Sequence, residues 1–269
     1  MAIQQQDLMI SSSGKPRKAL NKTIVLPLII SKENKAVMGV ILTTLATFLY
    51  LTSNHFHIAP PQLLPMSMID NAVPFIPETI WIYLSEYFLF FTTYAAMKDI
   101  RLSNRYVYSF LSLQTVSVLI FWVFPTAFPR DLFPLPEGLD AATAYVFKSL
   151  RTTDSPANCL PSLHVSSVYL SALMFLKERR SKFPYMFLWA TMIGVSTLTT
   201  KQHYLIDVIT GLLMAVTFHW IFDTLVTYRG SEAVAGTANG NGNGNGAGAA
   251  VPTGLTPGQG TPAGDQANR

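Results

Sequence analysis

The chain contains six apolar stretches, and each is long enough or nearly long enough to cross a lipid bilayer. A helix needs about 20 predominantly apolar residues to cross the hydrocarbon core. Hydrophobic residues make up 49% of the chain and charged residues only 13%, which is too apolar for an ordinary soluble domain. The sequence therefore predicts an all-α fold, a six-transmembrane helical bundle within residues 36–229. The predicted spans are approximately Ala36 to Ser53, Glu78 to Met97, Arg105 to Phe124, Leu160 to Leu176, Pro184 to Thr200 and Leu205 to Val226.

The positions of lysine and arginine predict how these spans are oriented. Cytoplasmic loops of membrane proteins carry an excess of basic residues. Here the basic residues gather in residues 1–35, 98–105, 177–182 and 229, whereas the loop at 54–77 has none. We therefore expect an integral, multi-pass membrane protein with both termini in the cytoplasm. The loops at 125–159 and 201–204 then lie on the extracytoplasmic or lumenal side.

The segments outside the six spans are polar or short. We expect residues 1–35 to form a basic cytoplasmic leader, in which the apolar run from Thr23 to Ile30 lies at the membrane interface. The stretch from Pro60 to Pro77 is rich in proline and predicts a loop with short helical pieces. Residues 230–269 are rich in Gly, Asn, Ala and Pro. Such a composition buries too little apolar surface to fold, so a disordered C-terminal tail is expected.

His203 and Asp207 lie four residues apart at the start of the sixth span. Residues at this spacing share one face of a helix, so the carboxylate can bind one ring nitrogen and leave the other free as a nucleophile or base. By itself this spacing is weak evidence, because histidine and aspartate occur four apart in many helices. Ionisable groups are costly at the ends of membrane spans, however, which favours a functional role.

The segment from Pro161 to His164 supplies the other parts of a phosphate site. Pro161 suits the first turn of a helix, where the next backbone N–H groups, including that of Leu163, lack intrahelical acceptors and attract anions. Ser162 can donate its hydroxyl to the same anion, and His164 can protonate a leaving oxygen. Arg130 and Lys201 are the nearest candidate cations. Together these residues predict phosphoryl transfer on one side of the membrane.

The two segments resemble the second and third signatures of the type 2 phosphatidic acid phosphatase and vanadium haloperoxidase superfamily. Pro161 to His164 resembles the signature Pro-Ser-Gly-His, and Ser196 to Asp207 resembles Ser-Arg-x5-His-x3-Asp. The resemblance covers about Pro125 to Gly211 at the level of motifs. It implies a lipid phosphatase or phosphotransferase that acts through a phosphohistidine and requires no metal or other cofactor.

Several positions depart from the superfamily pattern. Leu163 stands in place of glycine, Thr197 in place of arginine, and Val123 in place of the lysine of the first signature, which retains only Arg130. Lys201 is then the candidate that compensates for the arginine missing at 197.

These departures, with the sequence from Gln202 to Tyr204, resemble the branch that includes inositol phosphorylceramide synthases. In that branch an alcohol such as inositol or ceramide can replace water as the acceptor.

The resemblance assigns a role to each predicted site residue. His203 would attack phosphorus, Asp207 would hold its imidazole, and His164 would act as acid and then as base. Ser162, Leu163, Arg130 and Lys201 would bind the phosphate oxygens. The expected partners are a lipid phosphate or phospholipid substrate and the membrane itself.

The same residues admit other interpretations. Nucleic acid is not expected as a partner, because the basic residues form no aromatic-interleaved stripe. A non-catalytic lipid-binding or transport protein would need polar groups along a path through the bilayer, whereas here they gather at one end. Glu86 is the exception, near the middle of the second span, with Gln114 as its candidate partner. Cys159, the single cysteine, is expected to be an inert loop residue.

Overall fold

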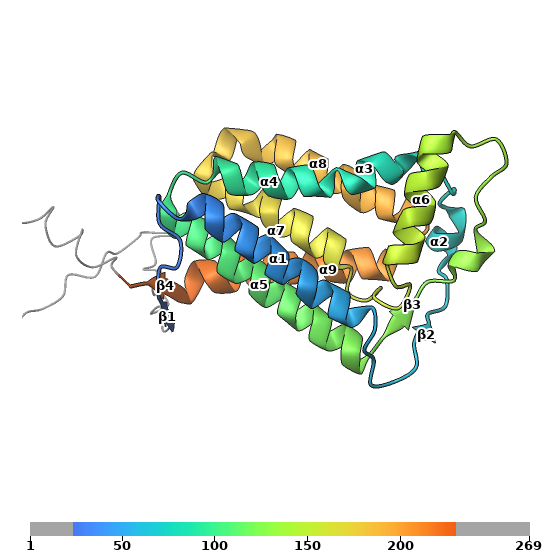
Figure 1. Cartoon of the computed structure of the whole chain (residues 1–269), viewed down its shortest axis with the longest axis horizontal. Helices are drawn as coiled ribbons and strands as arrows, with labels where there is room; N and C mark the ends of the chain where they lie inside the picture. The colour runs from blue at the N-terminus through green and yellow to red at the C-terminus, as the bar shows by residue number, and fades with distance from the viewer. Residues whose placement is uncertain (1–23, 230–269) are drawn as a thin grey trace, which may run out of the picture. The chain divides into compact units, whose positions relative to one another are not determined.

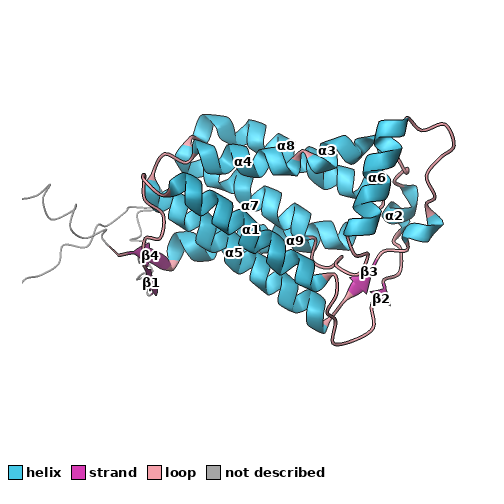
Figure 2. Ribbon diagram, viewed as in Figure 1, coloured by secondary structure: helices cyan, strands magenta, loops and turns pink. Residues whose placement is uncertain are grey.

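The computed structural model describes residues 24–229, which form a bundle of helices (Figure 1). The expected disordered tail at 230–269 and most of the basic leader, residues 1–23, lie outside the described residues. Within the described part the chain is mostly helical, with short strands at two places (Figure 2). The prediction of a mainly α-helical fold is confirmed.

Each of the six predicted spans contains helix. Among residues 24–229, three helices are long and apolar enough to cross a membrane: α1 (Lys35–Ser53), α5 (Ile100–Val123) and α9 (Leu205–Thr224). The chain is therefore a membrane protein by length and composition of its helices, while the count of six spans stays a prediction. The other predicted spans contain α3 (Ile80–Leu84), α4 (Glu86–Ala96), α7 (Leu163–Glu178) and α8 (Phe183–Thr199).

The second predicted span is divided into two helices at Ser85. α3 ends at Leu84 and α4 begins at Glu86. The Ser85 hydroxyl donates to the carbonyl of Ile82 at 2.6 Å and accepts a hydrogen bond from Trp189 Nε1 of α8 at 2.8 Å. A serine side chain that binds its own backbone competes with the helical ladder, which accounts for a break at this position.

Helix α7 lies at the centre of the bundle. It packs against α9, α8, α4 and α5, and most of its residues are buried. Three of its serines are among them, and Ser171 satisfies its hydroxyl with Tyr106 of α5 at 2.8 Å. Helix α1 instead packs mainly on α5, and only 6% of its apolar window is buried. Its exposed apolar side chains suit contact with lipid.

Short elements gather at one end of the bundle, near the N-termini of α7 and α9. They include α2 (Met68–Ala72), α6 (Ala141–Thr153) and the 3₁₀ turns Pro77–Thr79 and Arg130–Leu132. Strand β2 (Gln62–Leu63) pairs in parallel with β3 (Thr126–Ala127). The loop with short helical pieces expected between Pro60 and Pro77 is confirmed by α2.

The opposite end of the bundle holds the apolar run that was expected at the membrane interface. Within this run, strand β1 (Ile24–Leu26) pairs in parallel with β4 (Val226–Tyr228), directly after α9, and its place at the interface stays a prediction. The physical reason is that the unpaired backbone groups of both extended segments satisfy each other. A 3₁₀ turn (Arg180–Lys182) joins α7 to α8.

Gly211 generates a test of this packing. A Cβ atom at Gly211 of α9 would lie 2.7 Å from the carbonyl oxygen of Ser162 and 3.1 Å from Val165 Cβ in α7. Because that oxygen belongs to the backbone, α7 and α9 would have to separate. We expect Gly211→Ala to cost about 1–3 kcal/mol of stability and to lower the apparent unfolding temperature of the purified protein.

Gly194→Ala is the matched control. A Cβ atom at Gly194 of α8 would lie 3.7 Å from Tyr169, which is an ordinary contact. Alanine also favours a helix over glycine by about 1 kcal/mol, so the unfolding temperature should stay constant or rise. Equal destabilisation by both substitutions would contradict the close approach of α7 and α9.

Candidate active site

His203 and Asp207 form the predicted pair. His203 lies in the loop before α9, and Asp207 lies in the first turn of that helix. The distance from His203 Nδ1 to Asp207 Oδ2 is 3.3 Å, and the same oxygen accepts the backbone N–H of Tyr204 at 2.8 Å. Asp207 is fully buried and His203 is 5% exposed. This contact fixes the imidazole and leaves Nε2 as its free nitrogen.

The N-terminus of α7 forms the second part of the site. The helix begins at Leu163, and its N-cap is Ser162, whose Oγ accepts the N–H of Val165 at 3.3 Å. Pro161 was expected in the first turn but precedes the cap, because the serine side chain satisfies the helix terminus instead. The N–H groups of Leu163 and His164 occupy the first two helical positions and have no intrahelical acceptor. The Ser162 hydroxyl also retains its own proton for donation.

The two motifs meet directly. The N–H of Ser162 donates to the carbonyl oxygen of Asp207 at 3.1 Å. The rings of His164 and His203 lie 5.7 Å apart between centroids, at 61° to each other. Segments about forty residues apart in the sequence therefore bring the two histidines to the same site. The distance between their rings is short enough for a single phosphate group to contact both.

Arg130 is held next to this volume by an acidic residue. Its guanidinium donates to the carboxylate of Asp154 at 2.7 Å and to the carbonyl of the same residue at 2.8 Å. Tyr50 of α1 donates its hydroxyl to the other carboxylate oxygen. Arg130 is 8% exposed, and its Nε has no hydrogen-bond partner within residues 24–229. Asp154 therefore orients a buried cation that keeps unused donor capacity.

Lys201 has a structural contact that the sequence did not predict. Its Nζ donates to the carbonyl oxygens of Asp70 at 2.8 Å and Val73 at 2.6 Å, and it lies 4.9 Å from the ring centre of Phe133. Its backbone has φ of 53°, a left-handed conformation that directs the chain into the His203 loop. Burial lowers the pKa of Lys201, and the charge of Asp70 partly offsets the shift. Two of its three N–H groups thus anchor the loop, and one remains.

Two residues next to His164 were not predicted as site residues. The Tyr83 hydroxyl lies 2.6 Å from His164 Nε2 and 3.3 Å from Nδ1, and Glu86 Oε1 lies 3.3 Å from Nε2. The partner expected for Glu86 was wrong, because Gln114 donates to the carbonyl of Ala46. In the sequence, Glu86 was marked only by its charge in the middle of an apolar stretch. This signal did not indicate that His164 lies next to it.

Asp70 was also missed, because nothing in its local sequence marks it. Its Oδ2 forms a capping box with Ser67 at the start of α2, and its Oδ1 accepts the N–H of Leu205 at 2.7 Å. Burial alone would raise the pKa of Asp70, but the hydrogen bonds from Ser67 and Leu205 outweigh it and lower the pKa. The carboxylate thus joins α2 to the first residue of α9.

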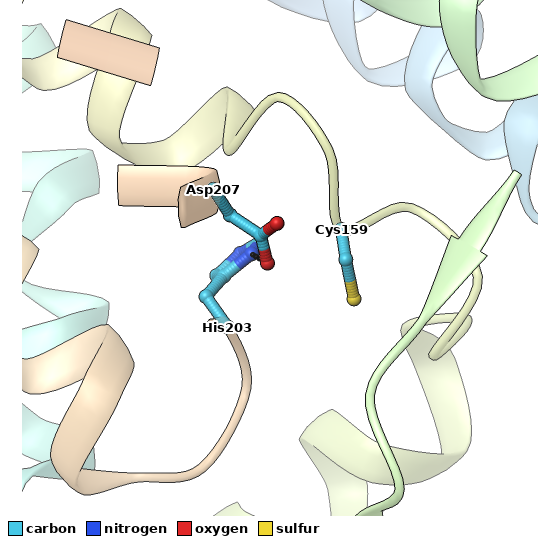
Figure 3. A group of neighbouring side chains, drawn as sticks. All are labelled: Cys159, His203 and Asp207. Atoms are coloured by element: carbon cyan, nitrogen blue, oxygen red, sulfur yellow. Dashed lines mark hydrogen bonds and ion pairs between the residues drawn. The ribbon is translucent and has the colours of Figure 1, made fainter. Parts of the chain in front are cut away.

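Cys159 completes a group that could hold a metal ion. Cys159, His203 and Asp207 offer ligand atoms that all lie within 4.8 Å of one another (Figure 3). Burial and the nearby Asp207 carboxylate raise the pKa of the Cys159 thiol well above its ordinary value, so the sulfur is protonated and a poor ligand until a metal displaces the proton. His203 and Asp207 already bind each other, and the chemistry of these donors does not call for a metal.

Comparison with known proteins gives one match. A family model described as the PAP2 superfamily matches residues 72–221, which is more than half of the chain. The matched range includes both histidines, Asp207 and Arg130. No curated protein and no solved structure matches the chain.

The contact of Asp70 with Leu205 generates a test of how the His203 loop is held. Asp70→Ala leaves the partly buried N–H of Leu205 without its acceptor and removes the half of the α2 capping box in which Asp70 accepts the N–H of Ser67. We expect a loss of about 1–3 kcal/mol in stability and faster amide hydrogen exchange in the peptide that covers residues 200–206. Asp131→Ala, which removes an exposed aspartate nearby, should change neither quantity. Unchanged exchange in Asp70→Ala would show that the loop is held by other contacts.

Proposed function

Because the chain belongs to the PAP2 superfamily, we propose that it is a membrane enzyme that cleaves or transfers the phosphate ester of a lipid through a phosphohistidine. The family match supports a phosphatase-type activity. The observation that carries the proposal is the pairing of His203 with buried Asp207, with the ring of His164 facing it at 5.7 Å. One histidine is oriented as a nucleophile and the other lies where an acid is needed.

The first half of the proposed reaction forms the phosphoenzyme. His203 Nε2 attacks phosphorus, and the P–N bond forms as the P–O bond to the lipid alcohol breaks. The proton on His164 moves to the departing oxygen, so that an alcohol and not an alkoxide leaves. Asp207 accepts the hydrogen bond from Nδ1 and stabilises the positive charge that develops on the His203 ring.

The second half returns the enzyme to its starting state. His164, now neutral, takes a proton from water or from an acceptor hydroxyl. The oxygen of that group attacks phosphorus and the P–N bond breaks. Each histidine thus ends with the protons it began with. Phosphate is released when water is the acceptor, and a new phosphodiester or monoester forms when the acceptor is an alcohol.

The negative charge on the oxygens of the transferred phosphoryl group is stabilised by hydrogen-bond donors that are fixed in place before the reaction. The N–H groups at Leu163 and His164 and the hydroxyl of Ser162 point from a helix N-terminus, which favours an anion. Arg130 and the remaining N–H of Lys201 supply cations for the equatorial oxygens. In this proposal Lys201 has two functions, since its other N–H groups hold α2.

The position of the site relative to the membrane indicates the class of substrate. A site at the end of a bundle whose helices can cross a bilayer is level with lipid headgroups, so the proposed substrate is a lipid phosphate or phospholipid. The distribution of basic residues supports a site on the extracytoplasmic or lumenal face.

The departures from the superfamily motif favour a second candidate within the same chemistry. Leu163 and Thr197 replace the usual glycine and arginine, and both are buried at the site end of their helices. These changes support a headgroup transferase like inositol phosphorylceramide synthase, with an alcohol such as inositol or ceramide as acceptor. In that case the acceptor hydroxyl takes the place of water beside His164.

The roles of the two histidines predict different responses to the leaving group. We expect His203→Ala to abolish phosphate release from both phosphatidic acid and p-nitrophenyl phosphate. His164→Ala should lose about 10²–10⁴-fold with phosphatidic acid, whose alcohol needs a proton, and much less with p-nitrophenyl phosphate, whose phenolate leaves unaided. The measurement is kcat/KM for each substrate with purified protein in detergent, because this quantity reports formation of the phosphoenzyme and not the later step in which His164 acts as a base.

His219→Ala is the control for this experiment, since His219 lies near the other end of α9. It should retain the activity of the unsubstituted protein. The proposed mechanism would be wrong if His203→Ala released phosphate as fast as the unsubstituted protein. Equal losses of His164→Ala with both substrates would remove His164 from the role of general acid.

An acceptor experiment separates hydrolysis from transfer. Phosphatidylinositol vesicles are incubated with the enzyme, with and without ceramide, and the products are separated. A transferase is expected to form inositol phosphorylceramide and diacylglycerol only when ceramide is present. In parallel incubations with phosphatidic acid vesicles, a phosphatase is expected to release phosphate at a rate that ceramide does not change. His203→Ala should lose either activity.

A further inference from the structure

Glu86 is a buried carboxylate that the proposed reaction does not use. It is the first residue of α4, is 3% exposed, and its Oε1 lies 3.3 Å from His164 Nε2. Its Oε2 has no hydrogen-bond partner among the described residues. A buried ionised carboxylate is strongly unfavourable unless a positive or hydrogen-bonding partner lies beside it. Within residues 24–229, the imidazole of His164 is the one group that lies at ion-pair distance from Glu86.

The break at Ser85 presents two residues to this imidazole. Tyr83 and Glu86 are three residues apart and share a face, although they belong to α3 and α4. The Tyr83 hydroxyl lies 2.6 Å from His164 Nε2, and its ring lies 4.6 Å from the His164 ring between centroids. Trp189 fixes the break from α8 through the Ser85 hydroxyl at 2.8 Å. His164 is therefore contacted by Tyr83 from α3 and by Glu86 from α4. The hydrogen bond between Ser85 and Trp189 fixes the break that lies between these two residues.

The groups around His164 include one carboxylate. Apart from Glu86 and Tyr83, the ring is faced by one aromatic residue from α1, by the other histidine and by a cation. These are Tyr50 at 6.5 Å between ring centroids, His203 at 5.7 Å, and Arg130. Arg130 and a positive His203 both oppose a proton on His164. Glu86 is the group among these that favours it.

We propose that Glu86 is a positioning residue that orients His164 and holds it in the protonated form required of the general acid. The inference rests on the proposed function, since His164 needs a proton only if it protonates the leaving oxygen. In the protonated ring the Tyr83 hydroxyl accepts the Nε2–H at 2.6 Å and the Glu86 carboxylate lies 3.3 Å from the same nitrogen, so the proton on Nδ1 is the one that moves to the substrate. Two carboxylate–histidine pairs then stand on opposite sides of the phosphate, with Asp207 serving the nucleophile and Glu86 serving the acid.

Glu86→Gln tests this role, because glutamine keeps the shape and removes the charge. In full-length enzyme with phosphatidic acid, we expect kcat/KM, which reports formation of the phosphoenzyme, to fall roughly 10- to 100-fold near the optimum pH. We also expect the alkaline limb of the pH–rate profile to move to lower pH, since the imidazolium loses its partner. With p-nitrophenyl phosphate, whose leaving group needs no acid, the loss should be much smaller.

Matched variants separate this role from a structural one. Glu78→Gln removes an exposed carboxylate in the turn before α3 and should leave rate and profile unchanged. Glu86→Asp keeps the charge and should restore part of the profile shift. A lower rate with unchanged profile shape and equal losses for both substrates would assign Glu86 to folding alone and overturn the proposal. An unaltered rate of Glu86→Gln with phosphatidic acid would also overturn the proposal.

The failure of this inference is distinct from failure of the proposed function. Loss of activity in His203→Ala supports the proposed function whatever Glu86→Gln does. If Glu86→Gln does not fold, as judged by its unfolding temperature, Glu86→Asp carries the test. In that case a larger loss of Glu86→Asp with phosphatidic acid than with p-nitrophenyl phosphate supports the positioning role, and equal losses with both substrates would overturn it.

Discussion

The site depends on a direct backbone contact between the first turns of α7 and α9. The N–H of Ser162 binds the carbonyl of Asp207, and one turn further along α9 Gly211 leaves room for the carbonyl of Ser162. Because the contact is made by main chain, the two helices cannot slide without losing it. His164 on one helix and His203 before the other are therefore spaced by rigid elements, and the accuracy of a phosphoryl-transfer site requires such rigidity.

Around this contact, buried polar groups are matched in pairs. Asp207 holds His203, Asp154 holds Arg130, and the carbonyls of α2 hold Lys201. Each pair keeps a functional group in one orientation in a region where an unpaired charge would be expensive. The same contacts thus offset the free-energy cost of burying these charges and orient the side chains of the site. This arrangement explains why so many ionisable side chains can be buried at the end of an apolar bundle.

The sequence was informative where the relation between residues is local. The spacing of His203 and Asp207 is a property of one helical turn, and the contact that it predicts is present. The helix start expected at Pro161 lies two residues later, at Leu163, because Ser162 caps the helix. The approximate positions of the helices followed from apolar length. The contacts of Asp70 with Leu205 and of Glu86 with His164 join residues far apart in the chain, and no local pattern encodes them. Helical propensity likewise gave no sign of the break at Ser85, where the serine hydroxyl binds both its own backbone and Trp189 of α8.

The pairing of β1 with β4 has a consequence for how the protein is made. Ile24 and Val226 lie at opposite ends of the described chain, so their hydrogen bonds can form only after every intervening helix has been synthesised and inserted. Contacts between such distant residues close the largest possible loop and are slow to form. We infer that this short parallel pair is the final step of assembly. A ribosome-bound chain that lacks α9 and the residues after it would already contain α7 and His203, but neither Asp207 nor the closed end.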